Sequence, residues 1–341
     1  MAAVARRHHD PGPEGRPLST GNWVDVHAHF TPPTTEEQRH TALTAMRELC
    51  FLAPQPYHWT VEGALRSMDR TGVAMQLLSA VPQTHDALRT SNDYGAELVT
   101  EHPGRFGLLA ALPTDDPQAA LTEIARADSA LRPDGWAVST TYHGVNLSDP
   151  ALEPVWDELN RRSAVVFVHP DTTRRPELGL PTPLVEVAFD TTRTVVAMLY
   201  RGIFHRHPDI RFILAHCGGA LPALSGRLGL LGTQPWVPDG DRFTAAHIAE
   251  QLSHLYLDTA ASGTDPNLAA ALTMVPVDHI LYGGDAGVPC SDDHTIAANI
   301  AALRNSSNIT PAQAELIGRR ALDLFPTAAH RLAGPRSGAD R

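Results

Sequence analysis

Residues 24–30 read VDVHAHF, and this stretch organises the rest of the chain. In an extended strand, successive side chains point to opposite faces, so Asp25, His27 and His29 share one face and the two imidazoles reach the same point in space. Pairs of imidazoles are common ligands of zinc and its neighbouring metals, which take further ligands from elsewhere in the chain. The stretch therefore predicts half of a metal site.

A second His-x-His pair, His205 and His207, lies in a helix-like stretch just before Pro208. A chain with 18 histidines in 341 residues contains roughly one such pair by chance, so the pattern needs context. The first pair ends an apolar, strand-like run and the second does not. We therefore interpret the second pair as a surface feature.

The composition favours a protein that acts on small molecules. With 341 residues, 43% of them apolar, the chain can bury a full core in one large α/β domain or two small ones. The net charge is −11, and no basic cluster follows Arg6 and Arg7, which argues against a nucleic-acid partner. No apolar run approaches a membrane span of about 18 residues, so we expect no membrane partner.

The cysteines and the N-terminus predict a cytoplasmic protein. Cys50, Cys217 and Cys290 are too few and too scattered for a disulfide framework, which fits a reducing compartment. The N-terminus lacks the apolar core of a signal peptide. Residues 1–20 are rich in proline, glycine and charge, and we expect them to form a flexible tail before a single domain at 21–335.

Short apolar runs alternate with helix-length segments, which is typical of βα units around a parallel sheet. The predicted strands are 23–27, 74–79, 106–112, 135–140, 164–169, 211–216, 255–258 and 279–283. The predicted helices are 61–71, 86–102, 117–131, 150–162, 190–206, 218–231, 265–273, 291–304 and 311–323, with a long loop at 30–60. Eight strands in about 260 residues favour a closed (β/α)8 TIM barrel over an open sheet.

Polar residues end several predicted strands, where barrels of this kind build their active sites. They are His27 and His29 on the first strand, His169 on the fifth, His216 on the sixth and Asp285 just past the eighth. A single histidine after an apolar run is usually a hydrogen-bonded rim residue. Together, however, these side chains predict a metal centre at the barrel mouth.

The fourth strand ends in Ser139-Thr140-Thr141, in a chain without lysine. Barrels that hold two ions commonly bridge them with a carboxylated lysine at this place, so we expect a single divalent ion. The expected ligands are His27, His29, His169 and Asp285. His216 is then free for proton transfer or for orienting a metal-bound water. Cys217 falls on the opposite face, and we interpret it as a packing residue.

The motifs DVHAHF (25–30), VFVHP (166–170), FILAHCGGALP (212–222) and LYGGDA (281–286) resemble the amidohydrolase superfamily. The resemblance runs from about residue 23 to residue 325, in the group of aminocarboxymuconate-semialdehyde decarboxylase and related metal-dependent nonoxidative decarboxylases. Within that group, 138–170 and 183–219 are similar to 6-methylsalicylate decarboxylases.

The resemblance implies one ion, usually zinc and sometimes manganese, bound by the four expected ligands, with His216 near the metal-bound water. It also implies that Arg227 contacts a substrate carboxylate, in some members from the neighbouring subunit of a dimer, so we expect a homodimer or a higher homo-oligomer. The alternative is that Arg227 lies on the surface of a helix and forms a salt bridge there. The chain departs from the family at Ala286-Gly287-Val288-Pro289, where an aromatic residue and a proline usually follow the aspartate, and at Cys217, where glycine or alanine is usual.

Two reactions can use this site. The favoured one is decarboxylation of an ortho-hydroxybenzoate-like aromatic acid, in which Asp285 protonates the ring carbon that carries the carboxylate. The alternative is hydrolysis of an amide, ester or lactone by a metal-activated water, with Asp285 or His216 as the base. A purely structural ion is a third reading, but structural zinc sites are normally closed.

The sequence gives only weak pointers to the substrate pocket. Trp59, Phe189 and Tyr142 fall on loops after predicted strands and fit the wall of a pocket for a flat or apolar ligand, although each could equally be rim packing. Arg47 in the first long loop is a second candidate for binding the carboxylate.

Overall fold

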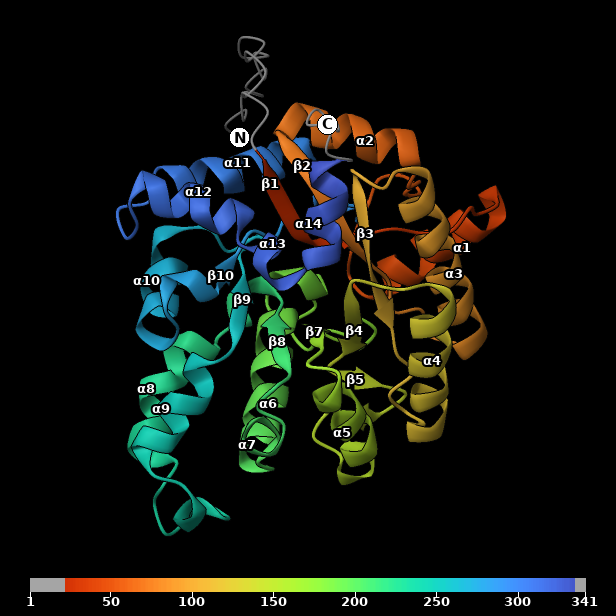
Figure 1. Cartoon of the computed structure of the whole chain (residues 1–341). Coiled ribbons are helices and arrows are strands. Elements are labelled where there is room, and N and C mark those ends of the chain that lie inside the picture. The colour runs from red at the N-terminus through yellow and green to blue at the C-terminus, as the bar shows by residue number, and fades with distance from the viewer. Residues whose placement is uncertain (1–21, 335–341) are drawn as a thin grey trace, which may run out of the picture.

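The computed structural model describes residues 22–334, and the predicted tail at 1–20 lies outside them. Eight parallel strands form the centre of the molecule, with helices around them (Figure 1). They are β1 (Trp23–His29), β2 (Val73–Ser79), β3 (Phe106–Ala111), β4 (Gly135–Ser139), β7 (Val165–His169), β8 (Arg211–Leu214), β9 (Tyr256–Asp258) and β10 (Ile280–Leu281). A short hairpin, β5 (Thr141–Tyr142) and β6 (Val145–Asn146), follows β4 and was not predicted.

The last strand segment joins the first, so the sheet closes. The Val26 N–H donates to the carbonyl oxygen of Tyr282 at 3.0 Å, and the His29 N–H donates to that of Ala286 at 2.7 Å. Neighbouring strands follow chain order around the barrel, from β1 to β10. The predicted (β/α)8 barrel is therefore confirmed.

The helices lie around this barrel, and each predicted helix corresponds to one or two of them. They are α1 (Glu36–Glu48), α2 (Val61–Thr71), α3 (His85–Glu101), α4 (Pro117–Ala130), α5 (Glu153–Arg161), α6 (Glu186–Tyr200), α7 (Ile203–Arg206), α8 (Leu221–Leu231), α9 (Ala245–Ser253), α10 (Asp265–Met274), α11 (Asp293–Arg304), α12 (Pro311–Arg319), α13 (Ala321–Leu324) and α14 (Pro326–Ala333). Short 3-10 turns cover Pro150–Leu152, Thr182–Leu184, His216–Gly218, Gly240–Arg242 and Val277–His279. None of the helices among residues 22–334 is long and apolar enough to span a bilayer.

Three predictions about the elements are wrong. The region 30–60 is not a plain loop, because α1 forms within it. The predicted helix at 190–206 begins at Glu186 and breaks before α7 at Gly202, which adopts a left-handed conformation with φ 71°. The strand predicted to end at His216 stops at Leu214, so His216 lies in a tight turn beyond it.

Local sequence signals explain where many helices begin. The hydroxyl groups of Thr60, Thr84 and Thr244 accept backbone N–H groups at the starts of α2, α3 and α9. Asp116 caps α4, where Pro117 occupies the first turn and has no N–H to satisfy. These caps set the positions at which the connections between strands and helices end.

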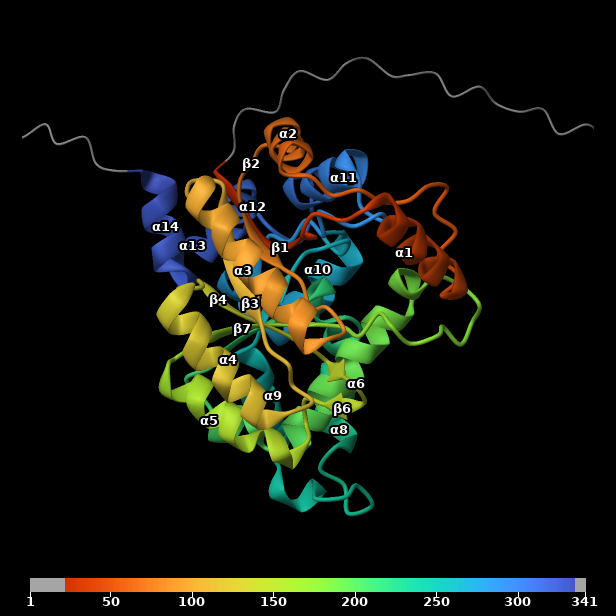
Figure 2. The same ribbon diagram turned by 90° about the vertical axis from the view of Figure 1, so that its right-hand side faces the viewer.

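The barrel interior is apolar at one end and polar at the other. Ala321 and Leu324 of α13, Phe325 between the two helices and Ala328 of α14 pack against inward-facing residues of the strands. Figure 2 shows these helices at one end of the barrel and α1 on the opposite side. The N-terminal end of the barrel is thus closed by packing, and the carboxyl ends of the strands remain for a site.

The interpretation of His205 and His207 as a surface pair is wrong for His207. This side chain is only 2% exposed, and its Nε2 lies 3.0 Å from the Glu153 carboxylate on α5. His205 is exposed. The residue before Pro208 therefore packs between helices rather than facing water.

Candidate active site

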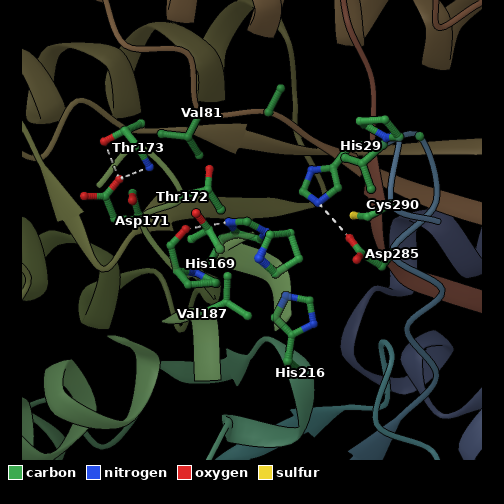
Figure 3. A pocket seen from close by; sticks show the side chains of 18 of the residues that line it. His29, Val81, His169, Asp171, Thr172, Thr173, Val187, His216, Asp285 and Cys290 are labelled. Atoms are coloured by element: carbon green, nitrogen blue, oxygen red, sulfur yellow. Dashed lines mark hydrogen bonds and ion pairs between the residues drawn. The ribbon is translucent and has the colours of Figure 1, made fainter. Parts of the chain in front are cut away.

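Three histidines and one aspartate converge at the carboxyl end of the barrel, and Figure 3 shows His29, His169 and Asp285 of this set. His27 and His29 come from β1, and His169 ends β7; one ring nitrogen from each lies within 4.8 Å of the others. Asp285 follows β10, and its Oδ1 lies 3.4 Å from Nε2 of both His27 and His29. The structure thus brings together the four residues predicted as metal ligands.

The outward nitrogen of each histidine faces an acceptor, and this fixes which nitrogen faces inward. Nδ1 of His27 lies 2.8 Å from the Asp258 carboxylate. The other Nδ1 atoms face carbonyl oxygens: Ser79 at 3.3 Å from His29, Pro170 at 2.9 Å from His169 and Ala260 at 3.3 Å from His216. Each Nδ1 therefore carries a proton in the neutral ring, which leaves the Nε2 lone pair for the centre.

Two of these lone pairs need a cation between them. Nε2 of His27 and Nε2 of His29 are 3.1 Å apart, and both lie beside the Asp285 carboxylate. Two unprotonated nitrogens at this distance repel each other unless a proton or a metal ion lies nearby. The donor set therefore fits one divalent ion held by imidazole nitrogen and carboxylate oxygen.

The surroundings of His27 favour positive charge. Burial alone would lower the pKa of this imidazole, but the charge of Asp258 and its hydrogen bond outweigh burial and raise the pKa to about 9. The same Asp258 carboxylate accepts the backbone N–H of His216 at 2.9 Å. One buried carboxylate thus attracts a cation to His27 and anchors the start of the His216 turn.

Asp285 is the acidic group of the site. Burial opposes its ionisation, but the hydrogen bond with His29 and the charges of His27 and His216 hold its pKa well below the usual range. The residue adopts a left-handed backbone conformation with φ 53°, which aims its carboxylate at the histidines. Without substrate, Asp285 is an ionised acceptor of protons.

His216 lies beside the convergent set. Its ring centroid is 4.8 Å from that of His27 and 6.0 Å from that of His169, and burial, with the charge of His27, lowers its pKa. His216 and Cys217 both have left-handed backbones, with φ 54° and 58°. Cys217 is buried in the apolar core, as the sequence predicted, although the strand does not continue to it.

Asp258 contacts His27 and His216 in this site, and the sequence did not predict it. It ends β9, the seventh strand around the barrel, as His169 ends β7 and His216 follows β8. The same rule that selected the histidines, a polar residue at the end of an apolar run, was available for it. Asp25 was also not assigned a role, and its carboxylate accepts the N–H groups of His27 and Gly284.

A cavity of about 940 Å³ opens above these residues. Its floor includes His29, His169, His216 and Asp285, and its walls are mostly apolar. The wall residues include Phe30, Met46, Leu49, Phe51, Tyr57, Val81, Leu184, Val187 and Val288. No arginine is among the described residues that line the cavity, and the basic side chains of the lining are the histidines of the floor.

The side chains predicted to bind substrate lie outside this lining. Trp59 is buried against Phe30 and borders a smaller neighbouring cavity. Phe189 is half-exposed on α6. Arg47, on α1, donates to the Ala53 carbonyl oxygen at 3.2 Å, and Arg227 is exposed on α8. Their roles toward substrate stay predictions.

Tyr142, also predicted on the wall, is fully buried, and its hydroxyl group donates to the carbonyl oxygen of Pro82 at 2.8 Å. Pro82 itself lines the cavity. Tyr142 therefore supports the wall from behind rather than forming its surface.

The unusual segment after Asp285 closes tightly on β1. Gly287 has φ 87°, and a side chain there would overlap the carbonyl oxygen of His29. The neighbouring Ala286 carbonyl oxygen accepts the His29 N–H. Only glycine fits this approach, so Gly287 helps to fix the position of His29.

The chain is 31% identical over 334 residues to decarboxylase macB of Penicillium terrestre, and this match covers 89% of this chain and 95% of the relative. It is 30% identical to the 6-methylsalicylic acid decarboxylase of Penicillium expansum, over 77% of this chain and 84% of the relative. The crystal structure of a dihydroxybenzoic acid decarboxylase from a Polaromonas species, with bound manganese and 2-nitroresorcinol, has a TM-score of 0.75 at 22% identity, over 92% of this chain and all of that one.

The family described as amidohydrolase matches residues 24–326, nearly the whole barrel. The resemblance seen in the four sequence motifs is thereby confirmed. This protein belongs to the amidohydrolase family.

Proposed function

We propose that the protein is a metal-dependent nonoxidative decarboxylase of an ortho-hydroxybenzoate-like aromatic acid. The observation that carries this proposal is the position of the ionised Asp285 carboxylate, beside a cluster that needs a cation, on the floor of an apolar cavity. The relatives named as decarboxylases of aromatic acids support the same reaction.

The metal ligands of this proposal are His27, His29, His169 and Asp285. We propose zinc, because three imidazoles and one carboxylate suit it, with manganese as the alternative that a solved relative contains. The ion supplies Lewis-acid attraction for the phenolic and carboxylate oxygens of the substrate. The protein supplies the orientation of the imidazoles, through the acceptors at each Nδ1.

The proton balance gives Asp285 two successive roles. The substrate enters with a phenolic O–H and an ionised carboxylate, and the ionised Asp285 accepts the phenolic proton. Asp285 then delivers this proton to the ring carbon that carries the carboxylate, using an electron pair of the ring. The carbon–carboxylate bond breaks, its electron pair restores the aromatic ring, and CO2 leaves with a phenolate as the other product. The low pKa of Asp285 before substrate binds is thus compatible with its later role as an acid.

His216 is proposed to orient the substrate rather than to hold the ion. Its Nδ1–H donates to Ala260, so its Nε2 is an acceptor directed to the same floor. Burial keeps the ring neutral by lowering its pKa. A neutral acceptor at this place can accept a hydrogen bond from a water beside the substrate, and so help to position the substrate next to Asp285.

The lining of the cavity favours a substrate with a single carboxylate. An ion held at the floor would attract one anionic end of the substrate, and the walls that rise from the floor toward α1 offer Met46, Leu49 and Phe51. A second carboxylate on the substrate would lie against these apolar groups and lose its hydration. An alkyl substituent on the ring fits there.

We also propose a cytoplasmic homo-oligomer, a dimer in the simplest case. Leu178, Leu180, Leu184 and Phe189 form an exposed apolar stretch near the cavity mouth, of the kind that protein contacts bury. Cys50, Cys217 and Cys290 are unpaired, as expected in a reducing compartment. Light scattering tests the oligomeric state.

Hydrolysis is the competing reaction. The low pKa of Asp285 is compatible with it, because an ionised carboxylate can act as the base that activates a water. The deciding experiment incubates the metal-loaded enzyme with hydroxybenzoates, small lactones and amides, and reads the products by mass. Our proposal predicts loss of CO2 from a hydroxybenzoate. Gain of water by a lactone or an amide, without decarboxylation of any acid, would overturn it.

A further inference from the structure

A second group of chemically active side chains lies outside the barrel centre. His85 is the first residue of α3, Asp115 lies in the connection from β3 to α4, and His143 lies in the turn between β5 and β6. Both histidine side chains are 42% exposed and the carboxylate is 19% exposed. The start of one helix and two connections thus meet at one imidazole–carboxylate–imidazole cluster.

The hydrogen-bond partners of His143 require either a second proton or a bound metal ion beside its ring. Its Nε2 lies 2.5 Å from the carbonyl oxygen of Gln83, which can only accept, so Nε2 carries a proton. Its Nδ1 lies 2.8 Å from Asp115 Oδ2, which is also an acceptor. A neutral His143 would therefore place two lone pairs against each other, and only a second proton or a metal ion removes this conflict.

His85 completes the cluster from the other side of the carboxylate. Its Nε2 lies 2.8 Å from Asp115 Oδ1, and its ring is nearly parallel to that of His143, with an angle of 5° between the planes. The ring of Tyr142 stacks on that of His143 at 4.5 Å, and the left-handed backbone of His143, with φ 46°, holds its direction. One ligand atom from each of the three residues lies within 4.8 Å of the other two.

We propose that His85, Asp115 and His143 bind a second divalent transition-metal ion, of the zinc class, separate from the barrel centre. Two imidazoles and one carboxylate are a common ligand set for such ions. Histidines that bind a metal usually donate their other N–H to a carbonyl or carboxylate oxygen, as His143 donates to Gln83. The ion displaces a proton from the cluster, so it binds more weakly at low pH.

The site has a structural consequence for the cavity. Val81, Pro82 and Gln83 line the cavity wall, and the cluster holds this segment through Gln83 while Tyr142 holds it through Pro82. An ion at the cluster would tie the β2–α3, β3–α4 and β5–β6 connections together. Metal binding at the surface would thus stiffen one wall of the substrate cavity.

Equilibrium dialysis against increasing free zinc tests the proposal on the full-length protein, with bound metal measured by elemental analysis. The wild type is expected to retain one ion per chain at low free zinc and to take up a second at higher concentrations. His143→Ala and Asp115→Asn should keep the first ion and lose the second. The exposed His247 on α9 offers a matched control, because His247→Ala should bind two.

Thermal unfolding gives a second readout, since an ion that binds only the folded chain raises its melting temperature. The second equivalent of zinc should raise the melting temperature of the wild type and of His247→Ala, but not that of His143→Ala. A wild type that saturates at one ion would show that a proton alone fills the cluster, and would overturn the proposal. A second ion that persists in both cluster variants would overturn it too, because the ion would then bind elsewhere.

Discussion

The carboxylate of Asp258 contacts two parts of the active site at once. It accepts from Nδ1 of His27 at 2.8 Å and from the backbone N–H of His216 at 2.9 Å, and it is fully buried. Asp258→Asn keeps the shape but removes the charge that raises the basicity of His27. Metal affinity should fall by roughly 10- to 100-fold, measured by competition with a chelator of known strength. An unchanged affinity would show that Asp258 serves only the fold.

His169 and His216 are proposed to have different roles, although both lie at the carboxyl ends of neighbouring strands, β7 and β8. His169 supplies a nitrogen to the convergent set, and His216 lies beside it. His169→Ala should therefore lose most of its metal together with its activity, while His216→Ala should keep the metal and lose activity. Elemental analysis of both variants, purified in parallel, separates the roles. Equal loss of metal in the two would make His216 a ligand.

The residues of the barrel floor could be predicted from sequence because one rule selects them. Active sites of such barrels lie at the carboxyl ends of the strands, so a polar residue at or just past the end of an apolar run is a candidate for the floor. The same rule also selects Asp258, which ends β9. Trp59, Phe189, Arg47 and Arg227 follow no such rule, since the position of a loop side chain depends on packing between distant segments.

The segment between β10 and α11 carries Asp285 and packs against β1. Gly287 within it has no room for a side chain, and its φ of 87° disfavours any other residue. Gly287→Ala should destabilise the fold by more than about 2 kcal/mol and weaken metal binding, because it pushes on the backbone of His29. Urea unfolding and metal analysis measure the two effects.

Gly226 provides the matched control for this substitution. It lies inside α8, and an added side chain would meet only open space. Gly226→Ala should therefore stabilise the protein by about 0.5–1 kcal/mol, since alanine favours a helix over glycine. Similar destabilisation by both substitutions would remove the special role given to Gly287.

Among the elements, strands were easier to predict than the long first connection. The eight strands are buried on both faces, so each appears in the sequence as an apolar run. By contrast, α1 buries only Leu43, and its exposed polar residues give no apolar period to detect. The hairpin β5–β6 is two residues long on each side, too short for any alternation to be seen.

The stability of the whole molecule should depend on the ion at the barrel centre. The proposed ligands come from β1, β7 and the segment after β10, so one ion links the first, middle and last parts of the barrel. When the free concentration of the ion is 100 times its dissociation constant, binding stabilises the folded chain by about 2.7 kcal/mol. Chelation should therefore lower the melting temperature by several degrees, and readdition should restore it. At low free metal, where only the barrel centre is expected to hold an ion, His169→Ala should respond to neither treatment, and an equal response there would place the stabilising ion elsewhere.

The central claim is that Asp285 transfers a proton to the ring carbon that loses its carboxylate. The most direct test is to run the reaction of a hydroxybenzoate in D2O and to locate deuterium in the product by NMR and mass. Both the phenolic proton and the carboxyl proton exchange with solvent, so we predict one deuterium on the carbon that carried the carboxylate. Asp285→Asn should form this product roughly 10²- to 10⁴-fold more slowly, beyond any loss of metal. A product that gains water and carries no deuterium on carbon, or one that loses CO2 without ring deuterium, would contradict the account.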